Sequence, residues 1–295
     1  MELTYHRKGD YLFPNLTVEE EASSPTTGYT YKLTATGADA SFTTQRVADG
    51  ISDKVLTFEY KSGKAISLAI VLDDITQTVY KIKPLSAASQ WTTYSFDLGQ
   101  QIAEAAWGGI GSRFRLVIGD GAGTELELRN LHIRARNAEE STLAAALFLG
   151  LQTESANQLG RFEDLTDYFS YETGYSYLYE PSEPEAGKPD DPYIFTASLT
   201  RDIAADENYL SFEYKCAKSA SLELFLQIAA GGSIPNLSIP ASNDWKSITF
   251  DLTAGKAQVL QNFPNAGKKG DRLRFDINNI NGTPLYIRAI RLHKK

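Results

Sequence analysis

Seven residues in the sequence are of the types that recognise a sugar through its ring face and its hydroxyl groups. An aromatic ring packs against the apolar C–H face of a sugar, whereas guanidinium and carboxylate groups form paired hydrogen bonds with hydroxyls. Trp91 and Trp245 are out of phase with the apolar residues that follow them, so we expect both rings to lie outside the core. The candidate residues are Trp91, Trp107, Arg115, Glu213, Trp245, Arg274 and Asp276.

The same residues also have structural interpretations. A tryptophan that opens a strand in both halves of the chain can be a packing anchor at the edge of a sheet. Glu59 with Arg115, and Glu213 with Arg274, can be ion pairs between neighbouring strands. Tyrosines occupy the odd positions 171, 175, 177 and 179, so as a strand they would form one aromatic row. Such a row is either a platform for glycans or part of the core, and we favour the core because strand aromatics usually pack.

Other chemistries have less support. The sequence has no Gly-rich phosphate loop and no G-x-S-x-G motif, and Cys216 has no histidine at a recognisable spacing. One cysteine and three scattered histidines do not form a zinc-binding pattern. We therefore expect no cofactor. A structural calcium site with Asp276, Asn278 and Asn279 is an alternative, although asparagine and aspartate more often form turns.

An internal repeat indicates which elements position the candidate residues. The segment L-T-F-E-Y-K at 56–61 recurs as L-S-F-E-Y-K at 210–215, and W-T-T-Y-S-F-D-L at 91–98 recurs as W-K-S-I-T-F-D-L at 245–252, both at an offset of 154 residues. The segment 111–116 then matches 270–275 at an offset of 159, so the second copy has gained five residues in one connection. A period this long is typical of a duplicated domain rather than a solenoid.

Both copies consist of short segments in which apolar and polar residues alternate. This pattern is typical of half-buried strands, since successive side chains leave opposite faces of a sheet. The sequence therefore predicts an all-β fold of two tandem antiparallel β-sandwiches of the jelly-roll type, related by internal duplication, at 1–137 and 138–295. The acidic start, Ala/Leu body and terminal glycine of 138–150 favour a short helix that opens the second copy, with a strand as the alternative.

The charge and hydropathy of the chain argue against two classes of binding partner. The 295 residues carry a net charge of −8, which argues against a nucleic acid held through its phosphates. No apolar run approaches the roughly 20 residues of a membrane-spanning helix. The first residues of the chain have neither a basic nor an apolar segment, so no export signal is visible. We expect a monomer.

The repeated motifs resemble those of a known group of domains. The motifs are L-x-F-E-Y-K, D/Q-W-x-x-x-x-F-D-L, G-x-R-x-R and a closing L-x-I/L-R, best seen at 210–215, 244–252, 270–275 and 285–292. They are similar to those of non-catalytic, galactose-binding-like or carbohydrate-binding-module-like β-sandwiches in polysaccharide-utilisation proteins of gut bacteria. The resemblance implies binding of an oligo- or polysaccharide and export to the periplasm or cell surface. Val117 stands where the second copy has Asp276, which argues against an equal role for both copies.

Three functions follow as hypotheses. The first is carbohydrate binding without catalysis. The second is a structural or adhesion module that spaces or binds another protein. The third is a glycoside hydrolase, which needs two carboxyl groups across a cleft; the adjacent pairs Asp73–Asp74 and Asp190–Asp191 do not supply them, because neighbours on a strand face opposite ways.

Overall fold

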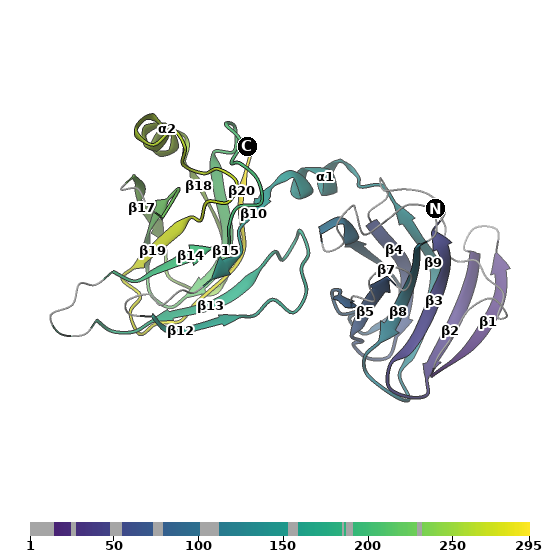
Figure 1. The fold of residues 1–295 in the computed structure, drawn as a ribbon. Coiled ribbons are helices and arrows are strands. Elements are labelled where there is room, and N and C mark those ends of the chain that lie inside the picture. The colour runs from purple at the N-terminus through teal and green to yellow at the C-terminus, as the bar shows by residue number, and fades with distance from the viewer. Residues whose placement is uncertain are drawn as a thin grey trace. The chain divides into compact units, whose positions relative to one another are not determined.

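A computed structural model of the chain describes residues 15–24, 28–47, 55–72, 79–100, 112–152, 159–184, 186, 191–228 and 232–295. The chain divides into two compact units. Unit 1 comprises Met1–Ser141 with Asp167–Ser170, and unit 2 comprises Thr142–Thr166 with Tyr171–Lys295. Most elements in both units are strands (Figure 1).

Unit 1 contains two antiparallel sheets. The first, here named the β4 sheet, consists in spatial order of β1 (Leu16–Ser24), β2 (Gly28–Ala35), β9 (Glu125–Arg134), β4 (Val55–Ser62) and β7 (Ala88–Asp97). The second, the β8 sheet, consists of β3 (Ala40–Val47), β8 (Ser112–Ile118), β5 (Leu68–Leu72) and β6 (Val79–Lys81).

Unit 2 also contains two antiparallel sheets. The β15 sheet consists of β12 (Leu159–Asp164), β13 (Ser176–Pro181), β20 (Leu285–His293), β15 (Tyr209–Cys216) and β18 (Ser242–Asp251), and the short β10 (Leu147–Phe148) also pairs with β20. The β19 sheet consists of β11 (Leu151–Gln152), β14 (Tyr193–Thr196), β19 (Arg274–Asn278), β16 (Ala220–Phe225) and β17 (Ser233–Ile239).

The predicted all-β class is confirmed, and the strand orders of the two units correspond. The central strand β4 lies between β9 and β7, and β15 lies likewise between β20 and β18. In both central strands the alternation of the sequence decides burial: Phe58 and Tyr60 are 1% and 4% exposed, and Phe212 and Tyr214 are both 2% exposed. These rings belong to two separate cores, one in each unit. The repeated apolar positions are therefore core positions.

The segment predicted as a helix at 138–150 divides into a helix and a strand. Helix α1 spans Ala138–Ala145, and β10 follows it directly. The helix begins with a capping box, since the Asn137 side chain accepts a hydrogen bond from the Glu140 amide and the Glu140 carboxylate accepts one from the Asn137 amide, both at 2.8 Å. Both alternatives for this segment are thus present, and the division between the structural units falls within α1, after Ser141.

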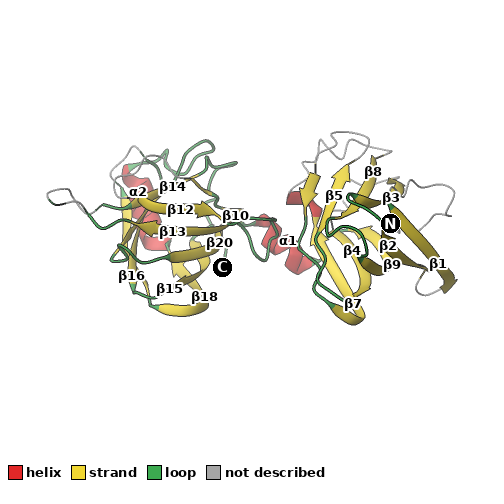
Figure 2. Cartoon of the chain, turned by 90° about the horizontal axis from the view of Figure 1, so that it is seen from below, coloured by secondary structure: helices red, strands yellow, loops and turns green. Residues whose placement is uncertain are grey.

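A second helix, α2 (Thr253–Asn262), occupies the connection in which the second copy gained five residues, and the sequence did not predict it (Figure 2). Its Lys256 is 5% exposed, and its ammonium group donates hydrogen bonds to the carbonyl oxygens of Ala204, Ala205 and Glu207 at 2.7, 3.3 and 3.0 Å. These bonds tie α2 to the loop before β15. Neither α1 nor α2 is long and apolar enough to cross a membrane, and the same holds for every helix in the described part of the chain.

Candidate functional site

The outer face of the β19 sheet gathers aromatic, basic and acidic side chains. Strand β19 lies between β14 and β16. Side chains alternate between the two faces of β19. Phe275 and Ile277 point into the core, where each is 1% exposed, and Arg274 and Asp276 point to the opposite face. Pairing between the strands then places further side chains beside these two. We name this set the Arg274 cluster; it consists of Asp191, Tyr193, Glu223, Phe225, Arg274 and Asp276.

Arg274 is the centre of the cluster. Its Nε and Nη2 donate to the two oxygens of Asp276 at 2.6 and 2.7 Å, and Nη2 also donates to both oxygens of Asp191 at 2.8 and 3.0 Å. The guanidinium carbon lies 4.2 Å from the ring centre of Tyr193 and 5.0 Å from that of Phe225. Paired charged hydrogen bonds and two aromatic neighbours fix the guanidinium plane, so the cluster is rigid before any ligand arrives.

Asp276 carries the unusual electrostatics of the cluster. Asp276 is only 4% exposed, and this burial raises the pKa of its carboxyl group to about 6. The hydrogen bonds from Arg274 act in the opposite direction and lower the pKa. The negative charges of Asp191 and Glu223 raise this pKa further. Glu223 is the cross-strand neighbour of Asp276 and accepts a hydrogen bond from the Ser233 hydroxyl. Three carboxyl groups thus share one face with the Arg274 guanidinium.

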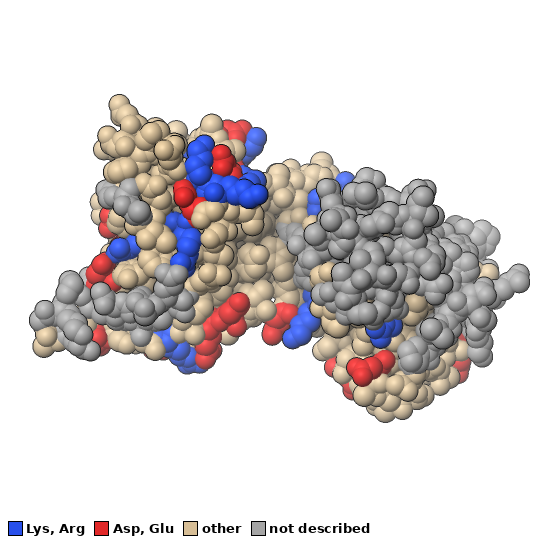
Figure 3. All heavy atoms as spheres, in the orientation of Figure 1, with Lys and Arg blue, Asp and Glu red and all other residues tan. Residues whose placement is uncertain are grey.

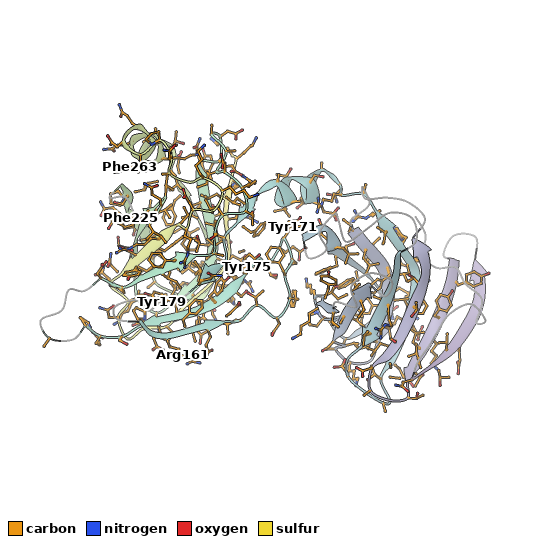
Figure 4. The ribbon with its side chains drawn as sticks, in the orientation of Figure 1. Arg161, Tyr171, Tyr175, Tyr179, Phe225 and Phe263 are labelled. Atoms are coloured by element: carbon orange, nitrogen blue, oxygen red, sulfur yellow. The ribbon has the colours of Figure 1, made fainter. Side chains whose placement is uncertain are left out.

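Figure 4 shows Phe225 on the side of unit 2 that also carries Phe263 and α2. The Phe225, Tyr193 and Arg274 side chains are all partly exposed, so this face presents ring surface and charge to solvent. On the view of unit 2 in Figure 3, basic and acidic side chains lie next to one another instead of forming a patch of one sign. Such a surface suits an uncharged, hydroxyl-rich ligand better than a polyanion.

A second polar group recurs on the outer faces of the β4 and β15 sheets. In unit 1, Arg129 donates to Glu59 at 2.5 Å, and its guanidinium carbon lies 4.1 Å from the ring centre of Trp91. The ammonium of Lys61 lies 4.5 Å from the same ring. We name these four residues the Trp91 cluster. The neighbouring strands β4, β7 and β9 supply all four.

Unit 2 has the matching arrangement, the Trp245 cluster of Glu213, Lys215, Trp245 and Arg288. Arg288 donates to Glu213 at 2.5 Å and lies 4.2 Å from the Trp245 ring centre, and Lys215 lies 5.1 Å from that ring. Trp245 is 38% exposed, and Trp91 is half-buried. Both tryptophans therefore lie outside the core, as their phase in the sequence predicted, and both lie against positively charged side chains of their own unit.

The predicted site residues separate into two groups. Glu213 and Trp245 lie on the β15 sheet, whereas Arg274 and Asp276 lie on the β19 sheet, and in unit 1 Trp91 and Arg115 are divided between the β4 and β8 sheets in the same way. The outer faces of two packed sheets point apart. The structure therefore brings Arg274 together with Asp276, and Glu213 together with Trp245, but does not join the pairs. Trp107 lies outside the described residues.

The expected ion pairs were wrong. Glu59 pairs with Arg129 and not with Arg115, and Glu213 pairs with Arg288 and not with Arg274. The reason is sheet order: β9 is the neighbour of β4, and β20 is the neighbour of β15, while β8 and β19 belong to the other sheets. Tyr193, Phe225, Arg129 and Arg288 were missed for the same reason, although their outward phase in alternating strands was a usable signal.

Two other expectations can be compared with the structure. Asp276 is bonded to Arg274, and Asn279 has a φ of +72°, which is typical of a turn-forming asparagine. Among the described residues, no group of three or more His, Cys, Asp or Glu side chains is arranged to hold a metal ion. In the tyrosine row, Tyr177 and Tyr179 are 2% and 1% exposed and belong to the core, as favoured.

Comparisons with known proteins add little detail. No protein-family model matches the chain, and no curated protein matches it. Among solved structures, a mutant of CBM29-2, a family 29 carbohydrate-binding module, is 14% identical with a TM-score of 0.32, over 45% of this chain and 86% of that one. A family 11 module from Clostridium thermocellum, in complex with a beta-1,3-1,4-mixed-linked tetrasaccharide, is 12% identical with a TM-score of 0.33, over 45% and 92%. Similarity this low identifies no ligand for this chain.

Proposed function

We propose that the protein binds an oligo- or polysaccharide without cleaving it, and that the Arg274 cluster of unit 2 is the binding site. The observation that supports the proposal is a guanidinium held beside two partly exposed aromatic rings and among three carboxyl groups, on one face of one sheet. The Trp91 and Trp245 clusters also combine these kinds of group, but there the arginine lies against one tryptophan ring and pairs with one carboxyl group.

The chemistry of a sugar matches this combination. Tyr193 and Phe225 offer ring surface for the C–H face of a pyranose, and the carboxylates of Asp191 and Glu223 can accept hydrogen bonds from its hydroxyl groups. The bonds between Arg274 and Asp276 hold the guanidinium in place before the sugar binds. Less side-chain freedom is then lost on binding, which favours affinity.

The bonds that Asp276 makes argue for binding rather than hydrolysis. A glycoside hydrolase needs one carboxyl group that can protonate the glycosidic oxygen and a second that attacks or activates water. Both oxygens of Asp276 accept hydrogen bonds from Arg274, and the residue is 4% exposed. A carboxyl group in this position orients the guanidinium and does not reach a substrate.

The wider setting of the proposal comes from the resemblance of the repeated motifs to carbohydrate-binding-module-like domains. We propose two such domains in one chain, 1–137 and 138–295, acting outside the cytoplasm as a monomer in a bacterial polysaccharide-degrading system. A structural or adhesion role is the second candidate. It is favoured by the Trp91 and Trp245 clusters, since an arrangement that both units keep is explained by what both folds need.

Affinity electrophoresis tests the proposal. The full chain is run through native gels that contain mixed-linkage β-glucan, xyloglucan, glucomannan, xylan or pectin, and retardation by at least one is expected. Phe225→Ala removes ring surface from the Arg274 cluster and should weaken that retardation about tenfold or more, the effect of losing a central aromatic contact. Arg161→Ala is the matched control, because Arg161 is exposed and pairs with Glu163 on its own strand.

The outcomes separate the candidates. Retardation that Phe225→Ala abolishes and Arg161→Ala preserves supports binding at the Arg274 cluster, provided that both variants melt at the temperature of the parent. Binding that Phe225→Ala leaves intact places the site elsewhere. No retardation by any polysaccharide favours the structural or adhesion role. Release of reducing sugar from a bound polysaccharide contradicts the non-catalytic proposal.

A further inference from the structure

Unit 2 contains a cavity that is separate from the Arg274 cluster. Its volume is about 330 Å³, and residues from both sheets line it. One side is the turn between β10 and β11 together with the residues that follow β14, and the other side is the end of β12 and the start of β13. Ligand pockets begin at roughly 300 Å³, so this cavity has room for a single ring and not for a chain.

The lining divides into an apolar floor and a polar rim. Leu149, Leu151 and Leu199 are 2–5% exposed and form the floor with the ring of Tyr177. The exposed side chains of Gln152, Asp164, Ser198 and Thr200 form the rim, and the half-buried ring of Tyr175 lies between. A pyranose has the same division, with C–H groups on its face and hydroxyl groups around its edge, so it suits this cavity better than a wholly apolar or a charged molecule does.

The walls are fixed by hydrogen bonds of the main chain. The Gly150 carbonyl accepts a bond from the Ala197 amide at 2.7 Å, and the Leu149 amide donates to Ile290 at 2.9 Å. On the opposite wall, the carboxylate of Asp164 accepts a hydrogen bond from the main-chain amide of Thr166 at 2.8 Å. The cavity therefore exists before a ligand binds, which is usual for small-molecule sites.

Gly150 keeps the cavity open. A Cβ atom at this position would lie 3.3 Å from the Tyr177 hydroxyl and 3.7 Å from the Tyr175 ring. Any side chain here would therefore point at the two tyrosines that line the cavity. The backbone of Gly150 is not in the left-handed region, so the missing side chain is not explained by backbone conformation.

We propose that this cavity is a second carbohydrate site, which holds one sugar ring. The proposal takes its class of ligand from the proposed function, but it uses none of the residues of the Arg274 cluster. A chain bound on the β19 sheet and a single ring bound in the cavity are two separate events, so one can be lost while the other is kept.

The test is a titration of the full chain with D-glucose, D-galactose, D-mannose and D-xylose, each followed by saturation-transfer difference NMR. Gly150→Val places two methyl groups in the cavity and should weaken binding of the sugar that is bound by about tenfold or more. Asp164→Asn keeps the oxygen that accepts from the Thr166 amide but removes the charge, and should weaken binding several-fold. Gly119→Val is the matched control, since a Cβ there meets only ordinary contacts with Ser67 at 3.5 Å.

Each outcome bears on one proposal. Binding that Gly150→Val removes, and that Gly119→Val and Phe225→Ala both keep, supports the cavity site. Binding of none of the four sugars by the parent chain overturns it, as does binding that Gly150→Val leaves unchanged. If Gly150→Val does not fold, the double variant Asp164→Asn/Ser198→Val replaces it in the test, because both residues are exposed on the rim of the cavity. Loss of sugar binding in this variant supports the cavity site, and unchanged binding overturns it. If Phe225→Ala is the only variant that loses sugar binding, the sugar binds at the Arg274 cluster and the cavity proposal is wrong.

Discussion

The strands β8 and β19 occupy corresponding places in the two units, yet the side chains around one shared arginine differ. Arg115 corresponds to Arg274 and is retained. Asp276, which pairs across the strands with Tyr193 and Glu223, is replaced by Val117, which pairs with Ser41 and Ala69. Phe225, opposite Arg274, is replaced by Val71, opposite Arg115. In unit 1, Ser41 and Val71 are 0% and 1% exposed. Unit 1 therefore lacks both the groups and the open surface of the Arg274 cluster.

The other pair of sheets gives the opposite result. The Trp91 and Trp245 clusters match residue for residue, and their arginine-to-ring distances of 4.1 and 4.2 Å are nearly equal. An arrangement that both units keep is explained most simply by what both units need, which is a stable outer sheet. An arrangement found in one unit is explained by what that unit alone does. The comparison therefore supports the proposed placement of the ligand on the β19 face, and it favours a packing role for the tryptophans.

The largest effect that should distinguish the units is a dependence of stability on pH. Burial raises the pKa of Asp276 to about 6 from its ordinary value of 3.8, so between these values the folded chain holds a proton that the unfolded chain has released. Stability from this group is therefore complete below about pH 4 and is lost as the pH rises through about 6. The loss is at most about 3 kcal/mol, since each pKa unit corresponds to about 1.4 kcal/mol.

Urea denaturation at several pH values measures this dependence. Unit 1 has a valine at the corresponding position and should not contribute. In Asp276→Asn the fall in unfolding free energy between pH 4 and pH 6 should shrink by the amount that Asp276 contributes. An identical pH profile for the parent and Asp276→Asn would show that the carboxyl titrates at its ordinary pKa.

The next effect concerns binding. Asp276→Val gives unit 2 the residue of unit 1 and removes both hydrogen bonds that orient the Arg274 guanidinium. We expect the affinity for a retained polysaccharide to fall about thirtyfold, or about 2 kcal/mol, because a central charged contact loses its orientation. Affinity electrophoresis at pH 7 measures it, with the melting temperature recorded beside it. An unchanged affinity would separate Asp276 from the binding site.

The reverse substitution in unit 1 should be costly and give no binding. Val117→Asp places a carboxylate two residues from Arg115, but Ser41, Ala69 and Val71 supply neither aromatic rings nor further carboxyl groups. We expect unit 1 to lose about 1–2 kcal/mol, the cost of a polar group placed in partly buried, poorly bonded surroundings. Chemical denaturation measures the loss. A new affinity for polysaccharide in this variant would mean that the arginine and the carboxylate are sufficient without the rings.

The sequence predicted the strands well because alternation is local. Three consecutive residues are enough to show which face of a strand points inward, as Phe58 and Tyr60 do in one unit and Phe212 and Tyr214 in the other. Arg274 and Asp276 were also found, since they lie two residues apart on one strand. The pairing between distant strands was not predicted: Arg129 is 70 residues from its partner Glu59, and Asp191 is 83 residues from Arg274. Alternation states which face a residue takes, but sheet order decides which residue stands beside it.

The smallest effects should be equal in the two units, and they involve the residues whose role changed most between sequence and structure. Trp91→Ala and Trp245→Ala each remove a ring that lies against one guanidinium and one ammonium, and cation–π contacts at such partly exposed positions contribute about 0.5–1 kcal/mol each. We expect each variant to lose about 1 kcal/mol of unfolding free energy and to keep its polysaccharide affinity within about twofold. Denaturation and affinity electrophoresis on the same preparations measure both quantities. If Trp245→Ala abolished binding while Trp91→Ala did not, the ligand would lie on the β15 sheet. The difference between the units would then depend on Tyr286, which pairs with Lys215. In unit 1 the corresponding Lys61 pairs with Glu127.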